Sequence, residues 1–333
     1  MKIIVTNIPA FYKINLYNAV NKKEKLLVIF TDSIEDDRNK DFISGNIEFK
    51  YEILKGSTWQ KTKRALQILK SNDHSELILG YWDSIILWIL AFMSPKRKNA
   101  FVVESSYYES TVFGIKGLVK RFFVSRLSKV YASGKAQRKI TDDLGFIGAT
   151  IITKGVGVFN YVPQPPYIEK EQVRNFIYVG RFVEVKNLKH LISVFNSLPQ
   201  YNLYLAGFGE QEEELKALAK ENTHFLGAVN NKELPNLYQK MDVFVLPSKS
   251  EPWGLVVEEA LNNGLPVIVS DRVGCAEEII DETNGIVFKL DEPSALNAAI
   301  VRMAEPSKYN YYRKNISQMN FEEIENKQIE CYL

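Results

Sequence analysis

The 333-residue sequence is poor in cysteine and histidine and lacks a long apolar run. Its two cysteines, Cys275 and Cys331, are too few for a disulfide scaffold, and their wide separation suggests a reducing compartment. The longest wholly apolar run covers Ile85 to Met93, nine residues against the roughly 20 that a bilayer-spanning helix needs. The apolar stretch at the start is too short for a signal peptide. These absences predict a cytosolic protein, and an aromatic content of 12% excludes a disordered chain.

Several motifs of catalytic chemistry are also missing. The sequence has no Asp-x-Asp, no His/Cys cluster at metal-ligand spacing, no Gly-x-Ser-x-Gly and no complete Gly-x-Gly-x-x-Gly. We therefore expect neither a metal site nor a bound cofactor, and the patterns of a serine hydrolase and of a dinucleotide oxidoreductase are not met.

The net charge of +2 hides an asymmetry between the two halves of the chain. Residues 1–165 carry 25 Lys+Arg and 15 Asp+Glu, a balance of +10, whereas residues 166–333 carry 17 basic and 25 acidic residues, a balance of −8. Such a split suits two domains with different partners, and an anionic surface is a candidate partner of the basic half. A solvated surface bias without a partner explains the charge equally well.

Short apolar runs alternate with helical patterns along the whole chain, which predicts an α/β protein with parallel sheets. The predicted strands are Lys2–Thr6, Lys25–Phe30, Glu48–Ile53, Glu76–Gly80, Ala100–Val103, Lys129–Ala132 and Thr150–Thr153 in the first half, and Phe176–Gly180, Tyr201–Gly207, His224–Leu226, Val243–Pro247, Pro266–Ser270 and Gly285–Phe288 in the second. The proline-rich stretch around Pro163-Gln164-Pro165-Pro166 interrupts this series and predicts a linker. We expect two doubly wound, Rossmann-like domains facing a cleft, in which a ligand binds at the carboxyl ends of the strands. The predicted divisions are a domain over residues 1–162, a linker over 163–172, a domain over 173–308, and a helical segment over 309–333 that returns to the first domain.

The most informative stretch is Ser250-Glu251-Pro252-Trp253-Gly254-Leu255-Val256-Val257-Glu258-Glu259-Ala260. Pro252 favours a helix that begins there and ends before Gly264, with Glu251 in the loop at its start. Glu251 and Glu259 are then about 80° apart around the helix axis, so both can reach one bound molecule. Glu258 points about 100° away from Glu259 and is predicted to be solvated. Taken alone, Glu251 also fits an acidic residue that merely complements the helix dipole.

This stretch resembles the Glu-x7-Glu motif of retaining GT-B glycosyltransferases of family 4, the glycosyl transferases group 1. Six further segments resemble the family in the same order, and together they cover most of the second domain: Tyr178 to Asn187, Ala206 to Glu210, Phe225 to Gly227, Asp242 to Ser248, Gly264 to Ile268, and Asn284-Gly285. The stretch Gly274-Cys275-Ala276-Glu277-Glu278 departs from the family pattern, because Cys275 replaces a second glycine.

Arg181 and Lys186 follow the predicted strand that ends at Gly180, where a diphosphate would need cations. Without the Glu-x7-Glu motif, the two residues would be interpreted as charges on a surface loop. The resemblance implies that this pair neutralises the leaving diphosphate, that Glu259 holds the ribose hydroxyls, and that Glu251 bonds to the donor sugar. It also implies a set of nucleotide-sugar contacts at Gly180, Gly207, Gly209, Pro252, Trp253, Gly254 and Leu255. For Gly207 and Gly209 a tight turn is the alternative to a close approach of the nucleotide.

The first domain matches the family less well. The loop after its first strand has no glycine pair, and Lys13 could supply positive charge in its place. Glu104 ends the strand from Ala100 to Val103, where many family members carry a histidine. Glu104 is a candidate catalytic residue that would orient an acceptor hydroxyl, and capping of the next helix explains it equally well. The segment Ser133-Gly134-Lys135 also follows a strand and is a weaker candidate for the site.

The resemblance implies a retaining, metal-independent glycosyltransferase that uses a UDP- or GDP-linked sugar as co-substrate. Its expected acceptor is a glycan or a lipid-linked glycan in the biosynthesis of a bacterial surface polysaccharide such as lipopolysaccharide. A nucleotide-sugar epimerase and a non-catalytic sugar-nucleotide-binding module of the same fold are the alternatives. No feature indicates a nucleic-acid partner.

The amphipathic stretch from Lys116 to Leu127 combines basic residues with leucine and phenylalanine. Such a helix can lie on anionic lipid, and it can equally cover one face of the first domain's sheet. The basic run Lys96-Arg97-Lys98 strengthens the membrane hypothesis, which places the protein at the inner face of the plasma membrane.

Overall fold

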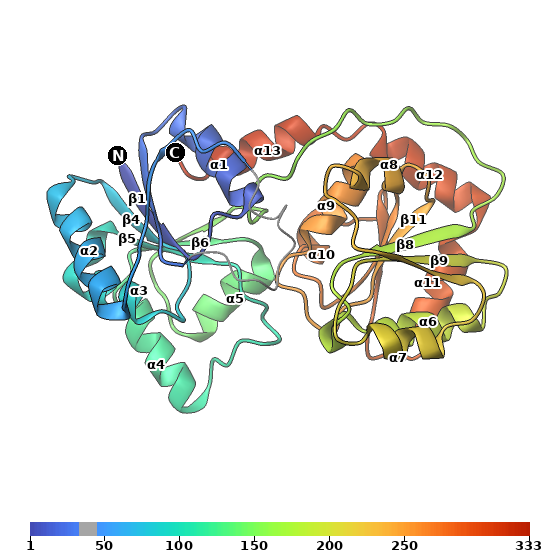
Figure 1. Cartoon of the computed structure of the whole chain (residues 1–333), viewed down its shortest axis with the longest axis horizontal. Helices are drawn as coiled ribbons and strands as arrows, with labels where there is room; N and C mark the ends of the chain where they lie inside the picture. Colours follow the sequence, from blue (N-terminus) through green and yellow to red (C-terminus); the bar gives the residue numbers. More distant parts are fainter. Residues whose placement is uncertain (33–44) are drawn as a thin grey trace. The chain divides into compact units, whose positions relative to one another are not determined.

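The computed structural model describes residues 1–32 and 45–333, which form two compact units. The first unit comprises residues 1–159 and 322–333, and the second comprises residues 160–321. Each unit is built around its own parallel sheet (Figure 1).

The sheet of the first unit has seven strands in the order β3-β2-β1-β4-β5-β6-β7. Every pairing in it is parallel, and the chain crosses over to a new edge after β3. The central strands are wholly buried, as expected for β-branched and leucine-rich runs that are covered on both faces. The strands are β1 (Lys2–Thr6), β2 (Leu26–Phe30), β3 (Lys50–Ile53), β4 (Glu76–Leu79), β5 (Asn99–Val103), β6 (Lys129–Ala132) and β7 (Ala149–Ile152).

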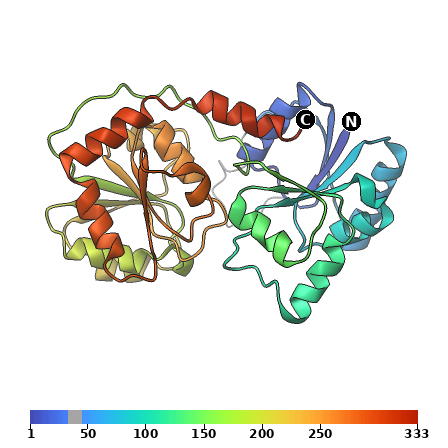
Figure 2. The same cartoon turned by 180° about the vertical axis from the view of Figure 1, so that it is seen from behind.

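Four helices cover one face of this sheet and share its apolar core: α2 (Thr58–Ser71), α3 (Ile85–Met93), α4 (Gly114–Val124) and α5 (Lys135–Asp143). A short 3-10 turn, η2 (Lys96–Lys98), connects α3 to β5. On the other face, α1 (Phe11–Asn21) lies beside α13 (Phe321–Glu330), as both Figure 1 and Figure 2 show. The chain end after α13 contacts the sheet, because Lys2 Nζ donates to the backbone oxygens of Tyr332 and Leu333 (2.5 and 2.9 Å).

The sheet of the second unit has six parallel strands in the order β10-β9-β8-β11-β12-β13. They are β8 (Asn175–Val179), β9 (Asn202–Ala206), β10 (Thr223–Gly227), β11 (Val243–Leu246), β12 (Val267–Ser270) and β13 (Gly285–Phe288). The helical elements of this unit are η3 (Glu184–Lys186), α6 (Leu188–Asn196), α7 (Glu212–Leu218), α8 (Leu234–Tyr238), α9 (Leu255–Asn262), α10 (Ala276–Ile279), α11 (Ala295–Met303) and α12 (Pro306–Ile316).

The proline-rich stretch before β8 is held to helices of the second unit by side-chain amides. Asn262 bonds to both backbone groups of Val162 (3.1 and 3.2 Å), and Asn310 does the same for Lys170 (3.0 and 2.8 Å). Amide side chains suit this role because each supplies both a donor and an acceptor to a segment whose prolines lack N–H groups.

The predicted fold class is confirmed, since both units are doubly wound α/β folds with parallel sheets. Most predicted strands lie within a residue or two of the observed ones, and the run from Lys2 to Thr6 matches β1 at both ends. Within the described ranges, no helix combines the length and the hydropathy that crossing a bilayer requires.

Candidate functional site

Three loops of the second unit carry the candidate residues, and they follow neighbouring strands of one sheet. Strand β8 lies between β9 and β11, so the loops after these strands leave the same edge. The first loop holds Arg181 and Lys186, the second holds Gly207 and Gly209, and the third holds Glu251.

An ion pair between Lys186 Nζ and Glu251 Oε2 joins the first and third loops. The two side chains are 16% and 13% exposed, so the pair is largely shielded from water yet reachable. Backbone contacts fix the register of the loops: Lys249 N donates to Val185 O (2.8 Å), and Asn187 Nδ2 donates to Pro247 O (3.2 Å). The structure therefore brings together two of the predicted site residues that lie 65 positions apart.

Arg181 presents an exposed positive charge in the loop that holds Lys186. Its side chain is exposed and forms no ion pair with a described residue. The Tyr178 hydroxyl donates to the backbone oxygen of Arg181 (2.9 Å), which fixes the loop where it leaves β8. Burial, together with the nearby Glu251 carboxylate, raises the pKa of Tyr178, so this phenol stays a neutral donor.

The acidic residue of the same loop, Glu184, is occupied elsewhere. Lys249 and Lys189 form ion pairs with it, and Gln211 Nε2 donates to its Oε2 (2.7 Å). Glu184 is therefore paired with Lys249 and Lys189, whereas Lys186 pairs with Glu251. The sequence analysis did not identify Lys249, although its place two residues before Glu251 was an available signal.

The glycines of the second loop are required by the packing of the protein's own backbone. A Cβ on Gly207 would lie 1.8 Å from Gly180 O, and one on Gly209 would lie 2.4 Å from Phe182 O. Gly180 and Gly207 have φ values of 152° and 146°, which favour glycine. The close approach at these glycines is therefore between the loops after β8 and β9, which places those loops against one another.

The third loop runs further before its helix starts than the sequence predicts. Helix α9 begins at Leu255 and not at Pro252, because Gly254 takes a left-handed conformation (φ 98°) as the residue before the helix. Glu251 itself is held in an extended conformation, with its N–H bonded to Arg272 O (3.1 Å) and its carbonyl accepting from Gly274 N (2.9 Å). The helix ends at Asn262, before Gly264, as expected.

The prediction that Glu258 is solvated is wrong. Its side chain is buried, and Trp253 Nε1 donates to Glu258 Oε2 (2.8 Å). Burial raises the pKa of Glu258 to about 8, in spite of the indole hydrogen bond that favours the charged form. The Trp253 indole reaches from the loop back to the helix. Helical periodicity alone does not predict such a tertiary contact.

Glu259 lies one position further along α9 and is partly exposed. Its carboxylate makes no hydrogen bond or ion pair with the described residues, and burial raises its pKa to about 7. Hydroxyl donors would relieve this desolvated carboxylate. It is therefore suited to accept hydrogen bonds from a polyhydroxylated ligand.

Cys275, at the place where the family pattern has a glycine, packs into the same region. Its N–H donates to Trp253 O (2.9 Å), and its side chain is fully buried. Leu255 opens α9 and is half-buried, whereas Pro252 is exposed. The loop thus combines a buried support, formed by Trp253 and Cys275, with exposed groups at its outer side.

The candidate residues of the first unit also form an ion pair. Lys13 on α1 lies 3.0 Å (Nζ to Oε2) from Glu104, which follows β5. Although burial opposes its charge, Glu104 and the neighbouring phenols raise the pKa of Lys13 well above the usual value. Burial raises the pKa of the adjacent Tyr17 to about 12. Lys135 is the first residue of α5, after Gly134.

Comparisons with known proteins give matches to the second unit and to the whole fold. Residues 164–319 match the family model described as Glycosyl transferases group 1. The O-antigen biosynthesis glycosyltransferase WbnH of Escherichia coli is 36% identical over 233 residues, which are 68% of this chain and 66% of that protein.

Solved structures resemble the whole described fold. Sucrose-phosphate synthase from Thermosynechococcus elongatus superposes with a TM-score of 0.77 at 17% identity, over 100% of this chain and 98% of that one. Anabaena HepE in complex with UDP-glucose gives a TM-score of 0.71 at 16% identity, over 99% of this chain and 98% of the other. These neighbours share the GT-B fold, in agreement with the predicted fold class.

Proposed function

We propose that the protein is a retaining glycosyltransferase with a nucleotide-diphosphate sugar as donor, and the match of residues 164–319 to the Glycosyl transferases group 1 model supports this. The observation that carries the proposal is the ion pair between Lys186 and Glu251, with Arg181 in the loop of Lys186 and Glu259 on the helix that follows Glu251. Cations suit a diphosphate and carboxylates suit the hydroxyls of two sugar rings.

In this proposal the diphosphate binds at Arg181 and Lys186. Arg181 is exposed and unpaired among the described residues, and the Lys186 ammonium has further donors besides the one that bonds to Glu251. The negative charge that develops on the leaving diphosphate is then neutralised by side chains. We accordingly propose that no metal ion is needed and that transfer persists in excess EDTA, whereas loss of transfer on chelation would contradict this part of the proposal.

The two carboxylates bind different parts of the donor. Glu259, with its unsatisfied carboxylate, binds the ribose hydroxyls, while Glu251, held by Lys186, bonds to the donor sugar. A bond from the acceptor oxygen to the anomeric carbon forms on the face where the bond to the phosphate oxygen breaks. The leaving phosphate takes the acceptor proton, so the configuration is retained.

For the acceptor we propose a glycan or lipid-linked glycan of a bacterial surface polysaccharide. WbnH, the relative described above, is named for O-antigen biosynthesis, and this supports the choice. In the first unit, Glu104 is proposed to orient the acceptor hydroxyl, with Lys13 fixing its position. The 22% exposure of the Glu104 side chain leaves room for such a contact.

The proposal is tested by separating donor binding from turnover. Thermal shifts with UDP-, GDP- and dTDP-sugars first identify the donor, since a ligand that binds the folded state raises its stability. Glu259→Gln should then weaken nucleotide affinity about tenfold and leave the turnover number nearly unchanged. Glu251→Gln should lower turnover with nucleotide affinity nearly unchanged, and the exposed Glu221→Gln serves as the matched control.

Titration calorimetry with the nucleoside diphosphate and steady-state kinetics provide the two measurements. A Glu259→Gln protein with the wild-type nucleotide affinity would show that the ribose does not bind at this helix. Equal effects of all three substitutions would show that the family motif does not form the donor site here.

A further inference from the structure

Helix α4 of the first unit has two apolar faces, and only one of them packs against the protein. Phe123 and Val124 are buried in the core, and Gly117 contacts the backbone of Val112 so closely that a Cβ would lie 2.2 Å from its oxygen. The opposite face is exposed, and it includes the residue before the helix. Its members are Phe113, Ile115, Leu118, Val119 and Phe122, with exposed fractions of 70, 82, 63, 50 and 60%. The expectation that this helix packs against the first domain is thus confirmed for one face, and the opposite face is left exposed.

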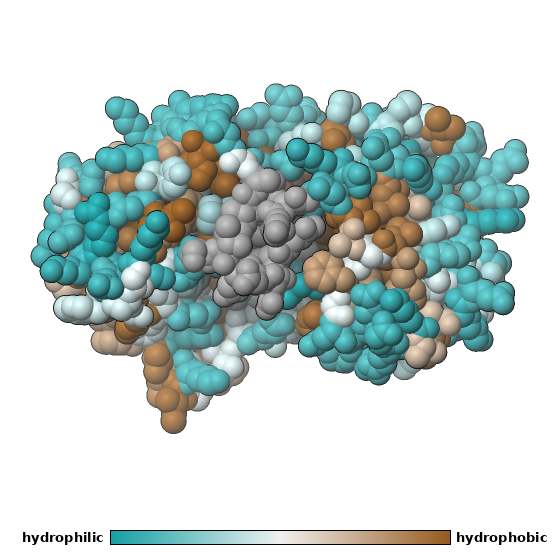
Figure 3. Space-filling view, viewed as in Figure 1, coloured by the Kyte–Doolittle hydropathy of each residue, from teal (hydrophilic) through white to brown (hydrophobic). Residues whose placement is uncertain are grey.

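The exposed face continues onto the end of α3. The Phe92 ring packs on Phe122, with 4.7 Å between their centroids, and Met93 is 59% exposed. We call the set Phe113, Ile115, Leu118, Val119, Phe122 and Met93 the α4 patch. Figure 3 shows apolar residues gathered at the projecting end of α4. Exposed apolar residues are usually scattered singly over a protein surface, so a contiguous cluster of them marks an interaction surface.

Positive charge surrounds the α4 patch. Residues 84–98 and 110–129, which include α3, η2 and α4, contain eight lysines and arginines and no aspartate or glutamate. Lys96, Arg97, Lys116 and Arg121 are exposed, and none of them forms an ion pair with a described residue. The turn that carries Lys96 and Arg97 adjoins the end of α4, since Arg126 Nη2 donates to Ser94 O (3.4 Å) and Ser128 Oγ donates to Arg97 O (3.1 Å).

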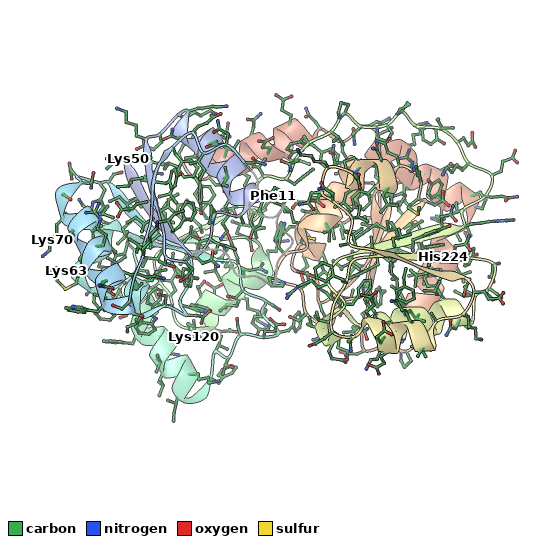
Figure 4. The ribbon with its side chains drawn as sticks, viewed as in Figure 1. Phe11, Lys50, Lys63, Lys70, Lys120 and His224 are labelled. Atoms are coloured by element: carbon green, nitrogen blue, oxygen red, sulfur yellow. The ribbon has the colours of Figure 1, made fainter. Side chains whose placement is uncertain are left out.

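Few acidic groups reach this surface from neighbouring elements. Lys120 lies on α4 (Figure 4), and its ammonium is 4.3 Å from the centroid of the Trp82 ring. Burial lowers the pKa of Lys120, and the nearby Asp83 opposes this shift. Arg121 contacts the backbone oxygen of Asp143 (3.3 Å), and Glu76 pairs with Lys129 at the far side. The rim of the patch therefore keeps its net positive charge.

We propose that the α4 patch docks on a membrane surface of anionic phospholipid. Apolar side chains on one helix face, flanked by unpaired lysine and arginine, insert shallowly between headgroups while the cations contact the phosphates. A second copy of this chain fits less well as the occupant. In a symmetric dimer the same patch faces itself, so the basic rims would repel each other.

Vesicle co-sedimentation tests this proposal without nucleotide or acceptor, so the outcome does not depend on the enzymatic proposal. The full chain should bind vesicles of equal parts phosphatidylglycerol and phosphatidylcholine and should not bind vesicles of phosphatidylcholine alone. Leu118→Gln combined with Phe122→Gln should reduce the partition coefficient at least about tenfold. Lys116→Glu and Arg121→Glu should each reduce it about fivefold, with a smaller effect at high salt.

Matched controls come from the second unit. Ile168, 66% exposed, is replaced by glutamine, and the exposed Lys232 by glutamate, and neither change should affect binding. Circular dichroism of each variant confirms that it folds. Equal binding to both vesicle types, or unchanged binding of the Leu118/Phe122 variant, would overturn the proposal. So would a dimer in solution that this double substitution dissociates, because the patch would then be covered by a second copy.

Discussion

Each unit contains a shielded lysine–glutamate ion pair, and the surroundings of the two pairs differ. In the first unit, Lys13 comes from a helix and lies with Glu104 among the phenols Tyr17 and Tyr332. In the second unit, Lys186 and Glu251 both come from loops and have the exposed Arg181 in the same loop as Lys186. A pair fixed by a helix and surrounded by phenols contributes to folding as well as to the proposed acceptor site. A pair on loops beside an unpaired cation can exchange its partner for a ligand.

The largest expected effect concerns the stability contributed by the first pair. Lys13→Met leaves Glu104 without its cation in a largely buried position, which should lower the free energy of unfolding by about 3 kcal/mol. Lys186→Met should lower it less, because the loop that carries Glu251 can turn the carboxylate toward water. Urea unfolding followed by circular dichroism measures both, with the exposed Lys232→Met as control. Equal losses of unfolding free energy in the two variants would show that both ion pairs contribute equally to folding.

The next effect concerns transfer and not stability. Arg181→Ala and Lys186→Ala should each lower kcat/KM by about 10–100-fold, since each removes a charge-assisted contact to the diphosphate that contributes about 1.5–3 kcal/mol. The melting temperature of the Arg181 variant should stay unchanged, because the side chain is exposed and unpaired among the described residues. Lys249→Ala is the control, since it removes a cation from the same loops that is bound to Glu184. Wild-type rates in the Arg181 variant would contradict the assignment.

The smallest effect, taken per pH unit, is a change of stability with pH. The pKa of Glu258 is raised to about 8 in the folded protein, above the value of about 4.5 for an exposed group. The folded state then binds the proton that the unfolded state has lost, so stability falls as pH rises from about 4.5 to 8. One proton corresponds to a slope of about 1.4 kcal/mol per pH unit.

Glu258→Gln should remove this contribution, because the amide oxygen can still accept from Trp253 and carries no charge at any pH. Unfolding measured at several pH values should therefore show a shallower slope for the variant, with Glu221→Gln as the exposed control. Identical slopes for wild type and variant would show that Glu258 is ionised in the folded protein.

The sequence carried most of the information on the sheets, because buried parallel strands are short apolar runs that can be recognised locally. The strand from Lys2 to Thr6 was predicted without error, and the one ending at Val103 began one residue late. The relation between Lys186 and Glu251 depended on the family resemblance, since neither residue alone differs from a surface charge.

The positions of Glu258 and Pro252 could not be predicted from local rules. Glu258 is buried because the Trp253 indole reaches back over α9, a contact that depends on the left-handed turn at Gly254. The same turn delays the helix to Leu255, although proline alone favours an earlier start. In both cases a tertiary contact overrides the local propensity.

The placement of the two cysteines gives each unit its own chemical reporter. Cys275 is fully buried in the second unit, beside the loop of Glu251, and Cys331 is half-buried in the part of the first unit that follows α13. Burial raises the pKa of both thiols, so neither is a reactive thiolate in the folded protein. An alkylating reagent reaches Cys275 only when its surroundings open, and the time course of its modification therefore measures how often the loop of Glu251 detaches from the core. The modification of Cys331 in the same reaction measures the opening of the chain end, so a single experiment resolves the local dynamics of both units.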